Sequence, residues 1–368
     1  SITAKERVLM DNLGIYIHIP YCAKKCPYCD FFSERYNKNS VMHYTDAVLR
    51  NLEYYSRRRI ADTVYFGGGT PSLMPAECIE RVINSVRRNF ILSENSEITL
   101  EVNPNTVNAD KLSDLYNAGV NRLSVGVQSL VESELKTLGR THTAERAVET
   151  VINAEKAGFK NISCDMIIGV PNQTSESIKY TIQKLSELPV THISSYILKI
   201  ENGTPFDNPD FISLMPDDDT VSDMYLLMVD ELEKRGFMQY EVSNFAKKGS
   251  ESRHNTKYWK CIDYLGIGAS AHSCFEGKRF FVPPDIEKFN NSPFQDISVT
   301  DENPCGFKEY AMLRLRLKEG LDVSQHPEII SKTPELLKAG YINFDGKKIS
   351  LTAKGYLMSN SVIEYLVF

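Results

Sequence analysis

The sequence predicts an α/β protein in which a partial (β/α)6 barrel of the TIM type is followed by a small α+β domain. Three observations lead to this fold. Six apolar, β-branched runs alternate with amphipathic stretches, polar residues gather where those runs end, and the last 65 or so residues read as helix, hairpin and helix. A chain of 368 residues has room for one large and one small domain.

The predicted strands are nearly continuous apolar runs, which are typical of parallel strands covered on both faces. They span residues 15–19, 63–69, 97–103, 122–128, 162–169 and 192–198. Amphipathic stretches at 44–58, 75–90 and 144–158 predict helices, with Pro75 at one helix start and glycines 119 and 158 at two helix ends. Six strand–helix repeats are too few for a closed eight-stranded barrel, so they favour a partial one with right-handed crossovers.

The predicted barrel covers residues 15–240. Residues 1–14 form an N-terminal lead, part of which we expect to come from an expression vector. Residues 241–303 are expected to be an irregular segment and linker that ends in a stretch rich in Pro, Asn and Asp. Residues 304–368 predict a winged-helix-like domain, with helices over 306–320 and 352–366 and a hairpin that turns at Asp345 and Gly346.

Charge and hydropathy exclude several functions. The formal net charge is −6, and residues 304–368 carry nine Lys and Arg against seven Asp and Glu, so no nucleic-acid partner is expected. No apolar run reaches the roughly 18 residues of a membrane helix, and no signal peptide is recognisable. We therefore expect a cytoplasmic protein without an integral membrane segment.

Three cysteines lie within eight residues, Cys22, Cys26 and Cys29, in the pattern C-x3-C-x2-C. A structural zinc site needs four ligands, and only His18 is near enough in sequence to complete one. An iron–sulfur cluster explains three thiolates better, because its fourth iron can stay open to a small chelating ligand. The other five cysteines, at 78, 164, 261, 274 and 305, are expected to be small buried hydrophobic residues.

Polar residues collect at the carboxyl ends of the predicted strands, the edge at which parallel α/β folds build their sites. The run "YFGGGTPS" (65–72) ends the second strand with three glycines, whose bare backbone could approach a ligand closely. Asp165 lies within an apolar strand, either as a hydrogen-bonded structural carboxylate or as a ligand contact.

These motifs resemble those of the radical S-adenosylmethionine (SAM) superfamily. "IHIPYCAKKCPYCDF", "FGGGTPS", "EVNP", "SVGVQS" and "LGRTH" are similar, in this order, to the oxygen-independent coproporphyrinogen III oxidase family, which includes HemN and HemW. The resemblance implies a [4Fe–4S] cluster held by Cys22, Cys26 and Cys29, an open iron that chelates SAM, and an electron that splits SAM into a 5′-deoxyadenosyl radical. It also implies that SAM is lined by Tyr16, Tyr28, Gly68, Gly69, Thr70, Glu101, Gln128, Arg140 and Asp165.

Two departures from the oxidase pattern favour the HemW branch of the family. The last cysteine of the oxidase motif is replaced by Phe31, and only 21 residues precede Cys22. An H-N-x-x-Y-W element resembles the marker of that branch and supplies the candidate heme contacts His254, Asn255, Tyr258 and Trp259. Alternatively, His254 hydrogen-bonds a loop, Trp259 fills a domain interface, and His272 lines a pocket.

The resemblance therefore implies a protein that binds heme as cargo and delivers it to an acceptor protein, with a flavodoxin- or ferredoxin-like electron donor. The alternatives are an oxidase that decarboxylates coproporphyrinogen III to protoporphyrinogen IX, another radical SAM enzyme, and a zinc-stabilised interaction protein. Whether the chain is an enzyme stays open at this point.

Overall fold

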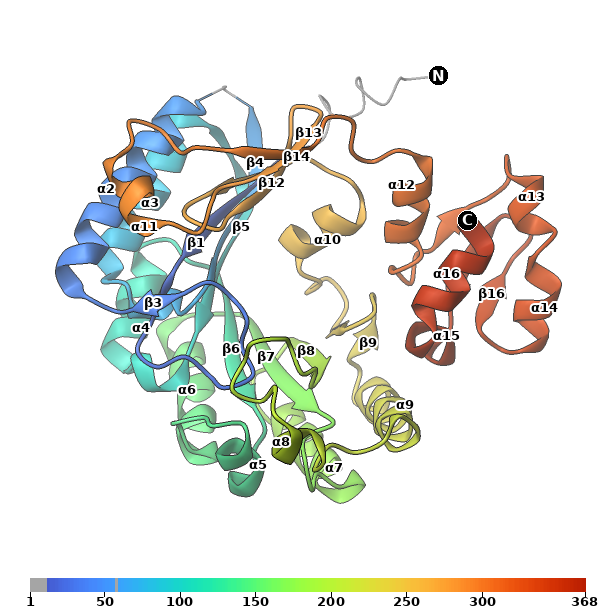
Figure 1. Ribbon diagram of the computed structural model, residues 1–368. Coiled ribbons are helices and arrows are strands. Elements are labelled where there is room, and N and C mark those ends of the chain that lie inside the picture. The colour runs from blue at the N-terminus through green and yellow to red at the C-terminus, as the bar shows by residue number, and fades with distance from the viewer. Residues whose placement is uncertain (1–11, 57–58) are drawn as a thin grey trace.

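The computed structural model describes residues 12–56 and 59–368 (Figure 1). Most of the predicted N-terminal lead, and the last two residues of the helix predicted at 44–58, lie outside these ranges. The six predicted parallel strands are confirmed, as β1 (Leu13–Ile19), β4 (Ile60–Gly68), β5 (Ile91–Val102), β6 (Arg122–Gln128), β7 (Asn161–Ile168) and β8 (His192–Ile197). β5 begins six residues earlier than predicted, because Ile91 and Leu92 already pair with β4.

The helices that follow the strands are α2 (Lys38–Tyr54), α3 (Ala76–Asn89), α4 (Ala109–Asn117), α5 (Glu132–Thr137), α6 (Ala144–Ala157), α7 (Ser175–Ser186), α8 (Pro209–Ile212) and α9 (Asp218–Lys234). The longer ones cover the convex side of the sheet (Figure 1), whereas Phe211 of α8 packs in a small apolar cluster with Tyr28 of the cysteine loop. As predicted, α3 begins directly after Pro75 and α6 ends at Gly158, whose φ of 114° is the left-handed cap conformation.

The six strands are part of one twelve-stranded sheet with the order β14-β13-β12-β11-β1-β4-β5-β6-β7-β8-β10-β9. β1 and β4 to β8 are mutually parallel in sequence order, and β11 adds a seventh parallel strand beside β1. The sheet is open, with β14 and β9 as its edges. This arrangement confirms the predicted α/β class with a central parallel sheet.

Residues 241–303 differ from the expected irregular segment, because they extend the sheet at both ends. They contain β10 (Asn244–Ala246), α10 (Arg253–Trp259), β11 (Tyr264–Ile267), β12 (His272–Phe275), β13 (Lys278–Phe281), α11 (Ile286–Asn291) and β14 (Ser298–Asp301), and β9 (Met238–Gln239) pairs with β10. Strands of three or four residues carry too little periodicity to be recognised in the sequence. The division of the chain into separate domains stays a prediction.

The parallel strands are buried on both faces, as the sequence predicted, but the outer face is apolar whereas the inner face is mostly polar. Ile17 and Phe66 are fully buried in the hydrophobic core beneath the helices. The alternate residues Tyr16, Tyr65 and Glu101 face the concave side. Because successive side chains of a strand point to opposite faces, one continuous sheet provides both the core and a polar interior.

Helix α10 lies on the concave side, at the amino ends of the strands (Figure 1). The His254 ring bonds Thr63 of β4 through Nδ1 at 2.8 Å and Tyr258 through Nε2 at 2.8 Å. The buried Glu97 carboxylate of β5 accepts the backbone N–H groups of Arg253 and His254, each at 3.1 Å. A carboxylate at these free amides holds the first turn of α10 against the sheet.

The C-terminal segment contains the predicted helices and hairpin beside a third strand. Its elements are α12 (Phe307–Arg314), β15 (Leu321–Asp322), α13 (Pro327–Ile330), α14 (Thr333–Lys338), β16 (Ile342–Phe344), β17 (Lys348–Leu351), α15 (Ala353–Leu357) and α16 (Ser359–Val367). α12 ends earlier than predicted because Leu317 bridges to Glu241. Gly346, at φ 90°, forms the predicted hairpin turn. No helix in residues 12–56 and 59–368 is long and apolar enough to cross a bilayer.

We expect the Glu97→Ala variant to unfold more easily than the parent protein by about 1–3 kcal/mol, because two buried amides lose a charged acceptor. Urea denaturation would measure the change in the free energy of unfolding. Glu94→Ala is the matched control, since Glu94 is an exposed residue of the same strand. Equal stabilities of the two variants would show that Glu97 does not anchor α10.

Candidate cluster and SAM site

The three clustered cysteines lie in the loop between β1 and α2. Cys22 belongs to the short strand β2 (Tyr21–Cys22), which pairs with β3 (Glu34–Arg35) on the far side of the loop. The Cys29 backbone N–H donates to the Cys26 carbonyl at 3.1 Å, so these two residues are joined by a tight turn. At the loop's end, His18 Nε2 bonds the Phe32 carbonyl at 3.4 Å. His18 therefore supports the loop and is not positioned as a fourth ligand.

The glycine run after β4 holds the start of this loop. The N–H groups of Gly69 and Thr70 donate to the carbonyls of Ile19 and Tyr21 at 2.8 and 2.7 Å. A Cβ atom on Gly69 would lie 2.7 Å from the Tyr21 carbonyl oxygen, and Gly68 has φ 113°. Close backbone packing at Gly69 and the positive φ of Gly68 therefore each favour glycine, whether or not a ligand also approaches the backbone there.

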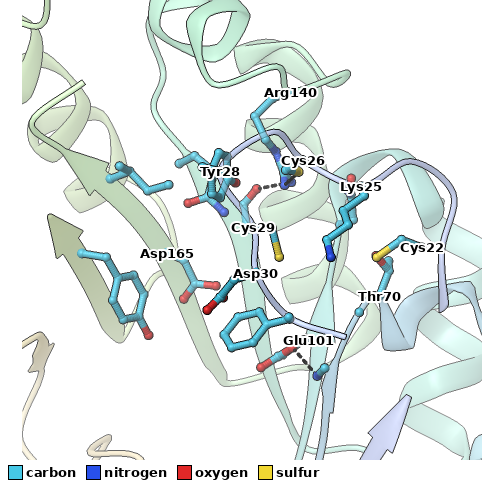
Figure 2. A pocket seen from close by; sticks show the side chains of 18 of the residues that line it. Cys22, Lys25, Cys26, Tyr28, Cys29, Asp30, Thr70, Glu101, Arg140 and Asp165 are labelled. Atoms are coloured by element: carbon cyan, nitrogen blue, oxygen red, sulfur yellow. Dashed lines mark hydrogen bonds between the residues drawn. The ribbon is translucent and has the colours of Figure 1, made fainter. Parts of the chain in front are cut away.

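The loop, the glycine run and the carboxyl ends of the strands surround one pocket of about 410 Å³ (Figure 2). The three cysteines and eight of the nine residues expected to contact SAM line it: Tyr28, Gly68, Gly69, Thr70, Glu101, Gln128, Arg140 and Asp165. Tyr16 does not; it lies deeper on the concave face, where its hydroxyl bonds His18 Nδ1 at 3.1 Å. Positions spread over residues 22–165 of the sequence therefore meet in one cavity.

Two carboxylates face each other across the floor of the pocket. Glu101 accepts the Tyr65 hydroxyl at 2.9 Å and the Gly68 N–H at 3.2 Å, and Asp165 accepts the Ser124 hydroxyl at 3.0 Å. Burial raises the pKa of Glu101 to about 7, and the neighbouring Asp165 charge adds to the shift. Burial also raises the pKa of Asp165. Two such carboxylates favour a cationic ligand group, because it would stabilise their charged forms.

Arg140 lies at the opposite side of the pocket, beside the cysteine loop (Figure 2). Its Nη1 is 3.3 Å from Cys26 Sγ, and its Nη2 donates to the Gly126 carbonyl at 3.1 Å. Its Nε is buried and makes no hydrogen bond with any described residue. The pocket thus presents a guanidinium near the thiols and carboxylates on the floor, which suits a ligand carrying both a carboxylate and an ammonium group.

The donor set fits an iron–sulfur cluster and SAM. None of the eight cysteines forms a disulfide, and in Figure 2 the sulfur atoms of Cys22, Cys26 and Cys29 border the same side of the pocket. Among the described residues, no three His, Cys, Asp or Glu side chains are arranged to hold a single metal ion. Three thiolates spaced around a cavity are compatible with a larger polynuclear group. When bound, such a cluster would be held by these three cysteines and would supply an electron to the sulfonium group of SAM.

The candidate heme contacts lie elsewhere, on α10. The His254 side chain has no exposed surface, and both its ring nitrogens are engaged. Asn255 lies in the first turn of α10 and donates its N–H to Oγ of the cap residue Ser252 at 3.4 Å. Trp259 is the last residue of the helix and is half-buried. Heme ligation by His254 would require its two hydrogen bonds to break, whereas its hydrogen bonding to a neighbouring segment is seen directly.

Several pocket residues were not predicted from the sequence. Tyr196, Ser124 and Lys25 line the cavity. Tyr196 lies near the carboxyl end of β8 and is 47% exposed. Tyr196 and Ser124 could have been found, because each follows the inward-facing period of its own strand. Lys25, between two of the cysteines, carries no such signal.

This fold and site define a class, that of the radical SAM proteins, and residues 16–185 match the Radical SAM superfamily. The coproporphyrinogen III oxidase HemN from Escherichia coli, a radical SAM enzyme, superposes with a TM-score of 0.81. It is 22% identical, and the match covers 99% of this chain and 92% of that one. At this identity the likeness shows a shared fold.

Closer relatives span nearly the whole chain. The heme chaperone HemW of Escherichia coli is 35% identical over 386 residues, which cover 97% of this chain and 98% of that protein. HemW of Haemophilus influenzae is 36% identical over 377 residues, covering 96% and 97%. The chain therefore belongs to the HemW family of the radical SAM superfamily. This membership implies a [4Fe–4S] cluster and SAM as cofactors.

We expect Cys26→Ser to lose most of its iron and acid-labile sulfide after anaerobic reconstitution, because two thiolates anchor a cluster poorly. Iron and sulfide analysis would measure this loss. Cys261→Ser is the control, since Cys261 is half-buried outside the loop. Full iron and sulfide in Cys26→Ser would contradict the ligand assignment.

We expect SAM binding to weaken as the pH falls below about 7. Protonation of Glu101 near its pKa of about 7 would remove the charge that is expected to pair with the SAM ammonium group. Affinity should therefore fall by up to about tenfold per pH unit. Equilibrium dialysis of the reconstituted protein between about pH 6 and pH 7.5 would measure it.

Glu101→Gln should bind SAM weakly and without this pH dependence, while Glu94→Gln should behave as the parent protein does. If SAM affinity changed with pH in the same way in the Glu101→Gln and parent proteins, Glu101 would not be the group that contacts the ammonium group.

Proposed function

We propose that this chain binds heme and delivers it to acceptor proteins. The observation that carries the proposal is the full-length similarity to several proteins named heme chaperone HemW. The pocket agrees with it, since it contains the elements expected for the cofactors of that family. The cytoplasm is the proposed location.

In this proposal Cys22, Cys26 and Cys29 hold the cluster, while Glu101 and Arg140 bind the ammonium and carboxylate groups of SAM. Asp165 and Gln128 accept the ribose hydroxyls. Gln128 has a positive φ of 68° at an irregularity in β6, and a non-glycine residue in this conformation is often held there for function. A flavodoxin- or ferredoxin-like protein would reduce the cluster.

Phe31 favours heme handling over the oxidase reaction. Its side chain is 63% exposed at the rim of the pocket, at the position where the oxidase motif has a cysteine. A phenyl ring at the rim can contact a flat macrocycle but cannot replace the thiol chemistry of that cysteine. The oxidase reaction thus lacks one of its motif residues here.

The test is to mix the anaerobically reconstituted protein with ferric heme, and separately with coproporphyrinogen III, SAM and a reductant. We expect a stoichiometric heme complex that passes its heme to an apo-acceptor such as a heme-free cytochrome, and no protoporphyrinogen. Absorption spectra would follow the heme, and chromatography the porphyrins.

Serum albumin, which binds heme without a dedicated acceptor, serves as the control for non-specific release. Formation of protoporphyrinogen would establish the oxidase instead, and failure to bind heme would remove the proposed function.

A further inference from the structure

Seven histidines are present in the chain, and all lie in described residues. Four are buried and hydrogen-bonded. His18, His192 and His254 each use both ring nitrogens, and His142 bonds the Val127 carbonyl through Nε2 at 3.1 Å with 3% of its surface exposed. None of these four imidazoles is free to approach a large ligand.

His43 and His326 are accessible, but their surroundings do not suit the binding of heme. His43 is on α2, in a hollow lined by the carboxylates of Glu34, Asp46, Asp285 and Glu287, which would repel the propionates of heme. His326 lies in the C-terminal segment, 28% exposed, with Nδ1 bound to Glu328 at 2.9 Å and its ring stacked on Phe307 at 4.0 Å.

His272, the first residue of β12, is different. Its side chain is exposed, and its ring nitrogens make no hydrogen bond with any residue of the ranges 12–56 and 59–368. The Phe281 ring lies beside it, nearly parallel, with the centroids 5.6 Å apart. Partial desolvation of the ring lowers the pKa of His272, which favours the neutral imidazole, the form that offers a lone pair to a metal.

The position of His272 on the sheet places it on the concave face. His272 is two residues from Cys274, which pairs with Tyr264 of β11, so the three side chains share one face. The Tyr264 ring contacts Tyr258 of α10 at 4.5 Å. This face therefore carries the Phe281 ring beside an accessible imidazole, and a pair of tyrosine rings on the neighbouring strand and α10.

His272 also lies near the cysteine loop. A Cβ atom on Gly266 of β11 would lie 2.3 Å from the His272 carbonyl oxygen, and Gly266 pairs with Tyr16 of β1, two residues before His18 on the same face. His18 in turn bonds the carbonyl of Phe32, at the end of the cysteine loop. A macrocycle at His272 would thus lie beside the loop that borders the pocket.

We propose that His272 is the axial ligand by which this chain holds the iron of heme, with the Phe281 ring beside the macrocycle. The inference rests on the proposed function and names the residue that carries it out. The imidazole lone pair displaces a water molecule from ferric iron, and no electron is transferred. Neutral imidazole is the usual histidine form in metal coordination, and flat rings pack well on a porphyrin.

The test titrates ferric heme into the anaerobically reconstituted full chain and into four variants, His272→Ala, His272→Gly, His43→Ala and His326→Ala. We expect the parent protein and the last two variants to show the absorption and electron paramagnetic resonance spectra of histidine-ligated ferric heme. His272→Ala should lose that signature and bind heme about tenfold more weakly or worse. Added imidazole should restore the signature in His272→Gly.

Iron, sulfide and SAM binding should be unchanged in the His272 variants, which shows that they are folded. An unchanged heme spectrum in His272→Ala, a thiolate-type spectrum in the parent protein, or loss of the signature in His326→Ala or His43→Ala would overturn the assignment and leave the proposed function standing. Failure of the parent protein to bind heme would overturn both.

Discussion

Two backbone hydrogen bonds fix the relation between the cysteine loop and the pocket, those from Gly69 to Ile19 and from Thr70 to Tyr21. Ile19 is the last residue of β1, and Tyr21 immediately precedes Cys22. Strand β4 therefore sets the direction in which the cysteine loop leaves β1. The approach is so close that a Cβ atom on Gly69 would collide with backbone, and a collision with backbone cannot be relieved by a side-chain rotation. The geometry of the thiols thus depends on a glycine 40 to 47 residues away from the three cysteines in sequence.

The polar interior adds a second constraint, because buried charges are costly unless other groups compensate for them. Arg122 is 2% exposed at the amino end of β6, and its Nε has no hydrogen-bond partner among the described residues. Its charge opposes the rise in pKa of Glu101 and Asp165. The guanidinium therefore helps to keep two buried carboxylates near their charged forms, and they in turn offset its own burial.

Much of this arrangement follows from sequence, and the remainder has a physical reason. Parallel strands end at one edge, so Glu101, Gln128 and Asp165 could be placed in one site from their positions at or near the strand ends. The resemblance added Arg140, which stands outside any strand and whose role no periodicity indicates. Strands β11 to β14 were missed because each gains its stability from neighbours in the sheet, and such long-range pairing leaves little trace in a four-residue stretch.

The H-N-x-x-Y-W element has a structural role in this fold, and its contact with heme stays a prediction. His254 and Tyr258 are four residues apart, which is the spacing of neighbours on a helix face, and their side chains bond each other. His254 also bonds Thr63, and its ring stacks on Tyr65 at 5.2 Å. Lys257 completes the contact by pairing with Asp62 at 2.7 Å. These bonds attach α10 to β4 at the amino end of the strands, away from the edge that carries the cysteines. The element therefore closes one end of the partial barrel, and this leaves the carboxyl edge and the adjacent concave face open for ligands.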